Sequence, residues 1–161
     1  DSAHYPAIVN RASALVTLGY CDSARVFVQS IMGRYADSAA MYVILGNTFL
    51  CENNRNNWDI ARQMYSEALQ KDTCSAPAYV GLGRTMGLLG VHDFALEQFQ
   101  RAIECDPSSQ VAHFNAGAAM LITGDYAGAV RHLEIAVDLD PKDEDAQKYL
   151  REARQKLQAG N

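Results

Sequence analysis

Residues 83–107 read GRTMGLLGVHDFALEQFQRAIECDP, and residues 117–141 read GAAMLITGDYAGAVRHLEIAVDLDP. When the two stretches are aligned at their first residues, small, rigid and large apolar residues recur at a constant offset of 34 positions. A fixed period of this length predicts a repeat architecture. The matched pairs are Gly83/Gly117, Gly90/Gly124, Ala95/Ala129, Phe99/Leu133, Ala102/Ala136 and Pro107/Pro141.

The residue pattern within each repeat predicts two helices joined by short turns. Residues 108–123 carry apolar side chains three or four positions apart and end at a glycine, whereas residues 125–141 begin with an aspartate and stop at a proline. These are start and stop signals of consecutive helices. A serine oxygen before a helix can accept hydrogen bonds from its free backbone N–H groups. Such serines precede the first helices of three units: Ser38, Ser75 and Ser109.

The motifs of these units resemble the tetratricopeptide repeat family, whose pattern is W-x2-L-G-x2-Y followed by A-x3-F-x2-A-x4-P. The third unit reads Tyr79-x2-Leu82-Gly83-x2-Met86, then Ala95-x3-Phe99-x2-Ala102-x4-Pro107. The second and fourth units follow the same pattern from Tyr42 and His113. The first unit departs from it at Arg11, Ala12 and Ala36.

The resemblance implies an all-α fold, a right-handed α-solenoid of about four antiparallel helix–turn–helix repeats. We expect units at 5–38, 39–75, 76–109 and 110–141, with a three-residue turn insertion in the second. Residues 142–158 place small and apolar side chains on one stripe of an otherwise charged helix. This pattern predicts a capping helix that covers the last unit, because an open-ended solenoid leaves its final repeat exposed.

Composition and charge exclude several classes of partner. The net charge of −5 is spread along the 161 residues, which argues against a nucleic-acid partner. No apolar run is long enough to span a membrane, and we expect no membrane partner. The chain begins at Asp1 rather than methionine, and we therefore expect a fragment of a larger protein.

Nothing in the spacing of reactive residues indicates catalysis, a metal or a cofactor. The histidines lack the spacing of metal ligands, and no nucleophile elbow, P-loop or dinucleotide motif is present. Four widely spaced cysteines form no C-x-x-C pair, and we expect free, buried thiols. A cytoplasmic location is the default that follows from reduced thiols. The four cysteines are Cys21, Cys51, Cys74 and Cys105. From the absence of these motifs we expect no enzyme activity.

The resemblance implies that the first helix of each unit lines a concave groove. This wall is mostly apolar and lacks the lysine and arginine clamp with which some family members hold a terminal carboxylate. We therefore expect a scaffold that binds a protein or peptide partner through an apolar or amphipathic segment. The predicted groove residues are Val9, Val43, Asn47, Leu50, Val80, Arg84, Leu88, Phe114, Asn115, Ala118 and Ile122.

Two other interpretations of the wall stay open at this point. Neighbouring helices or further parts of the parent chain can cover these side chains, so that the chain is a structural segment of a longer solenoid. The apolar wall or an end face can also serve self-association, which makes a homo-oligomer possible.

The stretch Cys51–Asp59, CENNRNNWD, is the one departure from the period. Gly46 and Ala61 lie three residues further apart than the equivalent pair in the other units. Asparagine favours turns, so we expect an enlarged turn, with Trp58 or Asp59 opening the next helix. A contact loop for a partner is the alternative, formed by Asn54, Arg55, Asn56 and Trp58.

Overall fold

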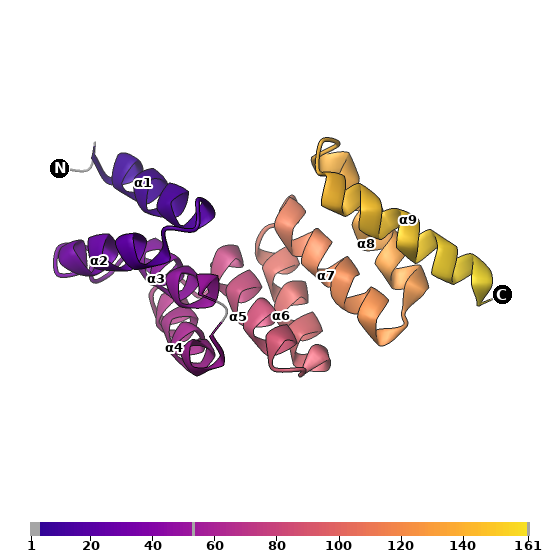
Figure 1. The fold of residues 1–161 in the computed structure, drawn as a ribbon, viewed down its shortest axis with the longest axis horizontal. Coiled ribbons are helices and arrows are strands. Elements are labelled where there is room, and N and C mark those ends of the chain that lie inside the picture. The colour runs from indigo at the N-terminus through magenta and orange to yellow at the C-terminus, as the bar shows by residue number, and fades with distance from the viewer. Residues whose placement is uncertain (1–3, 53, 161) are drawn as a thin grey trace.

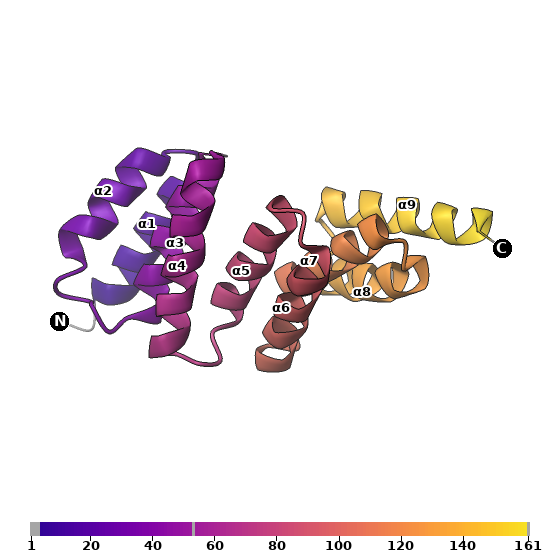
Figure 2. The ribbon, with the colours of Figure 1, turned by 90° about the horizontal axis from the view of Figure 1, so that it is seen from below.

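The computed structural model describes residues 4–52 and 54–160, and this part of the chain folds into nine α-helices and no strands. The helices follow one another along an elongated array with the two termini at opposite ends (Figure 1; Figure 2). The all-α solenoid expected from the repeat is therefore confirmed. The helices are α1 (Tyr5–Thr17), α2 (Cys21–Ile31), α3 (Ala39–Cys51), α4 (Arg55–Lys71), α5 (Ala76–Leu88), α6 (His92–Cys105), α7 (Gln110–Thr123), α8 (Tyr126–Leu139) and α9 (Glu144–Ala159).

Consecutive helices pack as pairs, and α9 follows the fourth pair. The pairs begin at Tyr5, Ala39, Ala76 and Gln110, and we keep these residues as the unit starts. Apolar side chains gather in small clusters between adjacent helices rather than in one central core. Each unit is therefore stabilised by its neighbours, as in other repeat proteins.

Polar side chains and left-handed glycines define several helix ends; the glycines are Gly19, Gly90 and Gly124. Ser38 and Ser109 accept hydrogen bonds from backbone N–H groups in the first turns of α3 and α7. Ser75 precedes α5 in the same extended conformation but makes no such bond. Gly124 ends α7 with a φ of 87°, which a residue with a side chain rarely adopts.

The ring of Tyr65 fixes how closely the second unit approaches the third. It is fully buried and lies beside Gly46 of α3 and Gly81 of α5. A Cβ atom at Gly46 would lie 2.7 Å from Tyr65 Cε1, and a Cβ atom at Gly81 would lie closer still. Glycine at these positions therefore lets three helices pack around one aromatic ring.

The asparagine-rich run does not form the enlarged turn that we expected. The connection between α3 and α4 spans residues 52–54, which equals the length of the connections before α2 and α6. The extra residues instead lengthen α4, which has 17 residues where α6 and α8 have 14. Asn54 starts the helix early, because its side chain accepts a hydrogen bond from the backbone N–H of Asn56 at 3.1 Å. Asn53 lies outside the described residues.

The expectation of free thiols was wrong, because the four cysteines form two disulfides. Cys21 at the start of α2 pairs with Cys51 at the end of α3, and Cys74 before α5 pairs with Cys105 at the end of α6. The first bridge joins the first unit to the second, and the second bridge joins the last turn of the second unit to the end of α6 in the third. Paired cysteines remove the ground on which a cytoplasmic location was expected.

Helix α9 packs along α8 and covers the end of the fourth unit (Figure 1). Ala146, Leu150 and Ala153 are its buried residues, and Asp143 caps its first turn by accepting a hydrogen bond from the Ala146 N–H at 3.0 Å. In the described part of the chain, no helix combines the length and hydrophobicity required to cross a membrane.

Candidate binding groove

Two pockets lie on the face formed by the first helices of the units. The first, named the α3–α5 pocket, has a volume of about 550 Å³ and lies among α1, α3 and the start of α5. The second, named the α5–α7 pocket, has a volume of about 320 Å³ and lies between the last turns of α5 and the middle of α7, with α6 beneath. Together they form the candidate groove.

Eight of the eleven predicted groove residues line these two pockets. The structure places the other three in the apolar clusters: Leu50 and Val80 are buried, and the ring of Phe114 meets Tyr149 of α9 at a centroid distance of 5.4 Å. Val9, Val43 and Asn47 line the α3–α5 pocket, and Arg84, Leu88, Asn115, Ala118 and Ile122 line the α5–α7 pocket.

The α5–α7 pocket is predominantly apolar. Leu88 and Ile122 stand at its opening, with 45% and 66% of their surfaces exposed, and Gly87 leaves space between them. Phe99 and small residues of α6 and α7 form the floor. An exposed leucine and isoleucine around a hollow are typical of a surface that binds an apolar side chain.

Polar groups in this pocket are few. The side-chain amide of Asn115 donates to the Val111 carbonyl at 2.7 Å, so it is partly used within its own helix. The Arg84 guanidinium is exposed and forms no ion pair with a described residue.

Asn47 and Tyr65 connect the groove to the core between the second and third units. The Tyr65 hydroxyl donates to Asn47 Oδ1 at 2.7 Å, which fixes the orientation of the asparagine. Burial raises the pKa of the Tyr65 hydroxyl above its ordinary value, and the nearby Arg84 guanidinium opposes this shift. Tyr65 therefore stays neutral near physiological pH and does not neutralise Arg84.

Two carboxylates that line the α3–α5 pocket were not predicted from the sequence. Asp72 Oδ1 accepts from the Cys74 N–H at 3.0 Å, and Asp106 Oδ1 accepts from the Ser108 N–H at 3.1 Å. The two aspartates are one period apart in the sequence, and this offset is the signal that could have found them. The residues lining this pocket include neither lysine nor arginine.

The residues of the proposed contact loop do not form a loop. Asn54 caps α4, Arg55 and Asn56 are exposed in its first turn, and Trp58 is half-buried against the cluster between α3 and α4. None of the four lines either groove pocket. Their contact with a partner stays a prediction that the geometry does not support further.

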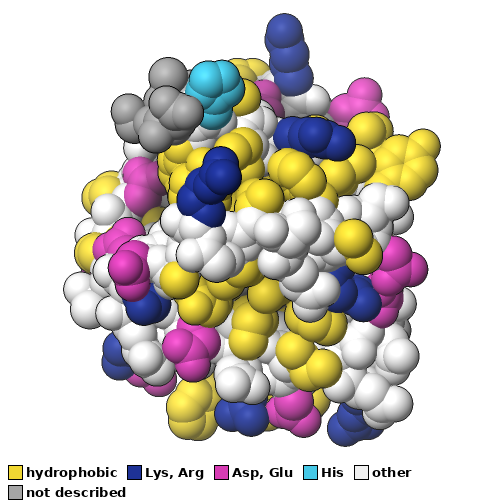
Figure 3. Space-filling view, turned by 90° about the vertical axis from the view of Figure 1, so that its left-hand side faces the viewer, with side chains coloured by type: hydrophobic (Ala, Val, Ile, Leu, Met, Phe, Trp, Pro, Cys, Tyr) yellow, Lys and Arg dark blue, Asp and Glu magenta, His cyan; other side chains and the backbone are white. Residues whose placement is uncertain are grey.

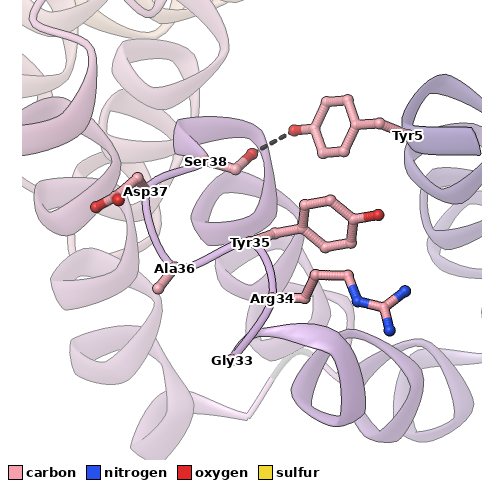
Figure 4. Close-up of a pocket in the computed structure, with 7 residues that line it drawn as sticks. All are labelled: Tyr5, Gly33, Arg34, Tyr35, Ala36, Asp37 and Ser38. Atoms are coloured by element: carbon pink, nitrogen blue, oxygen red, sulfur yellow. Dashed lines mark hydrogen bonds between the residues drawn. The ribbon is translucent and has the colours of Figure 1, made fainter. Parts of the chain in front are cut away.

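A third hollow, of about 870 Å³, lies at the turn between α2 and α3. Figure 4 shows Tyr5 of α1 beside Tyr35, with the Tyr5 hydroxyl hydrogen-bonded to Ser38. Although this hollow is larger than either groove pocket, its other lining residues belong to a single turn, and it contains none of the predicted groove residues. We therefore place the candidate site in the groove.

Two histidines pack together in the fourth unit, away from the groove. The Nδ1 atoms of His113 and His132 are 3.0 Å apart, and His113 Nε2 lies 3.2 Å from the Pro107 carbonyl oxygen. Burial lowers the pKa of His132, as do the neighbouring His113 and Arg131, while Asp125 opposes the shift. Within residues 4–52 and 54–160, no three His, Cys, Asp or Glu side chains gather in a way that could hold a metal ion.

Comparisons with known proteins agree with this architecture. A family model described as tetratricopeptide repeat matches residues 98–131. A thermophilic TPR protein of Thermus thermophilus, TTC0263, shares the fold with a TM-score of 0.81 at 18% identity, over 92% of this chain and 80% of that chain. A comparison with curated protein sequences finds no match.

Two further solved structures are similar at 20% identity. The first TPR of Spaghetti (RPAP3), bound to the HSP90 peptide SRMEEVD, has a TM-score of 0.69 over 74% of this chain and 93% of that chain. The Arabidopsis OM64 TPR domain has a TM-score of 0.66 over 73% of this chain and 94% of that chain. The chain thus contains a tetratricopeptide repeat and has the fold of tetratricopeptide repeat proteins, which confirms the resemblance.

Proposed function

We propose that the chain is a non-enzymatic interaction module that binds an apolar or amphipathic segment of a partner protein in its groove. The observation that carries this proposal is the α5–α7 pocket, where Leu88 and Ile122 are exposed around an apolar hollow. A partner side chain placed there would remove both residues from water, which is the main favourable contribution to association.

The proposed mode of binding does not involve a terminal carboxylate clamp. The α3–α5 pocket is lined by two aspartates and by no lysine or arginine, so a free C-terminal carboxylate would meet like charge there. The RPAP3 domain in complex with an HSP90 peptide supports peptide binding by this fold, but the charges of the present groove favour a different ligand.

Peptide selection tests this function. We expect a displayed library of random peptides, each about twelve residues long, to yield binders whose affinity falls at least about tenfold in Leu88→Glu or Ile122→Glu. The matched control is Ile135→Glu on α8, which adds the same charge at an exposed isoleucine outside the pockets. Equal loss in the control, or no loss in the two groove variants, would contradict the proposal.

The N-terminal end of the molecule favours a second candidate function, stacking against another helical repeat or a second copy of the chain. Hydrophobic side chains are interspersed with basic and acidic ones on this end (Figure 3). Leu18, Tyr20 and Val26 of the first unit are at least 60% exposed, whereas α9 covers the opposite end. We expect concentration-dependent association in sedimentation that Val26→Glu weakens; a monomer at every concentration would argue against self-association.

The two disulfides support a proposal about location. Disulfides form and persist in oxidising environments, and we propose that the protein acts in such a compartment rather than in the cytoplasm. An alkylating reagent added while the protein is isolated from its native source should modify none of the four cysteines, as measured by the mass of the intact chain. Four reactive thiols would contradict this location.

A further inference from the structure

The two pockets of the groove carry opposite charges. Arg84 lines the α5–α7 pocket, while Asp72 and Asp106 line the α3–α5 pocket. From these charges we propose that the occupant of the groove is an apolar peptide segment that places an acidic side chain against Arg84 and a basic side chain toward the two aspartates. This inference rests on the proposed function and specifies the chemistry of the partner.

The environment of Arg84 favours an acidic side chain in the ligand. Its guanidinium forms no ion pair with a described residue, and burial keeps the Tyr65 hydroxyl, on which its charge acts, neutral. A purely apolar ligand would strip water from this cation without replacing it. A carboxylate would form paired, charge-assisted hydrogen bonds with the guanidinium, so an acidic side chain is selected over a neutral one.

The environment of Asp72 and Asp106 favours a basic side chain in the ligand. Each uses Oδ1 to accept backbone N–H groups of its own turn, and Oδ2 makes no hydrogen bond to a described residue. No lysine or arginine forms an ion pair with either carboxylate within the described part of the chain. A basic side chain of the ligand would therefore meet two available carboxylate oxygens, and an acidic one would be repelled.

The length of α5 between the two pockets sets the spacing that we expect in the ligand. Pro77, which lines the same pocket as the aspartates, and Arg84 are both on α5, and seven residues of helix rise about 10 Å. An extended peptide covers this distance in about three residues, whereas a helical ligand needs about seven. The acidic and basic residues of the ligand should therefore lie about three or about seven positions apart, with apolar residues beside the acidic one.

The displayed library of random peptides, about twelve residues long, tests this pattern by sequencing the selected binders. We expect Asp or Glu next to Leu, Ile or Phe, with Lys or Arg at one of the two spacings. With Arg84→Glu the acidic preference should invert to a basic one, and each wild-type binder should lose at least about tenfold in affinity. With Asp72→Asn and Asp106→Asn, which retain the Oδ1 acceptors of the turns, the basic preference should disappear.

The control is Arg151→Glu on α9, which makes the same change of charge at an exposed arginine outside the pockets. Binders that depend on Leu88 and Ile122 but show no acidic preference, or that bind Arg84→Glu unchanged, would overturn this inference and leave the proposed function intact. A failure to select any binder that depends on Leu88 and Ile122 would overturn both.

Discussion

Loss of the Cys74–Cys105 bridge, which links the second unit to the third, should lower the stability of the chain by a measurable amount. The two cysteines are 31 residues apart in the sequence, and a cross-link that closes a loop of this size restricts the unfolded chain by about 3.7 kcal/mol in the loop-entropy treatment. For a chain of this length, about 1 kcal/mol corresponds to about 2–4 °C in Tm. The double variant Cys74→Ser/Cys105→Ser should therefore melt about 7–15 °C below the wild type.

Thermal melting followed by circular dichroism at a fixed scan rate measures this difference, with and without a reducing agent. Reduction should lower the Tm of the wild type, and in the double variant it should produce only the smaller decrease that comes from the Cys21–Cys51 bridge. A wild-type Tm that does not respond to reductant, together with four thiols that titrate before reduction, would refute the pairing and the location proposed from it.

Three further predictions concern stability. Gly46→Ala should destabilise the protein by about 1–3 kcal/mol in urea unfolding, because the new Cβ would overlap the fully buried ring of Tyr65. Gly87→Ala, which has open space around the new Cβ, should instead stabilise the helix by about 0.5–1 kcal/mol. Equal effects of the two substitutions would contradict the packing around Tyr65. Asn54→Ala should cost about 1 kcal/mol by the same measurement, and no change would show that the side chain does not start α4. The pKa of His132 is lowered in the fold, so the unfolded chain binds more protons, and the stability that comes from neutral His132 is present above about pH 6.5 and is lost as the pH falls toward the lowered pKa. Urea midpoints measured from pH 7.5 to 5.5 should therefore fall less in His132→Gln than in the wild type. Parallel curves for the two proteins would refute this role of His132.

The repeat period predicted the helix pairs because packing in a solenoid is local. The same small and large residues recur where each helix meets its partner, as at Gly83 against Phe99 and Gly117 against Leu133. Contacts within one unit and with the next unit decide this architecture, and the residues that make both sets of contacts recur in every repeat.

The cysteine pairs and the start of α4 were missed for different reasons. The bridged cysteines are 30 and 31 residues apart, close to one period, and residues about one period apart lie near each other in stacked units. That spacing was the available signal. At α4, the low helix propensity of asparagine suggested a turn, but one asparagine side chain capping the helix was sufficient to start it three residues earlier.

Only part of the groove was predicted from the sequence, because the direction of a side chain depends on the helices that pack beside it. Arg84, Leu88 and Ile122 point into a pocket, whereas Val80 lies on the same helix as the first two but is buried against α6 and α7. Phe114 meets Tyr149 because α9 packs beside it, and no spacing within the repeats shows where a terminal helix will lie.

The most direct test of binding in the groove is to map a selected peptide on the protein by the amide chemical shifts of the labelled chain. Binding in the groove should perturb Gly83–Leu88 of α5 and Ala118–Ile122 of α7, together with the turn residues around Asp72 and Asp106. Shifts confined to the exposed faces of α4, α6 and α8, or to the N-terminal end over α1 and α2, would contradict it.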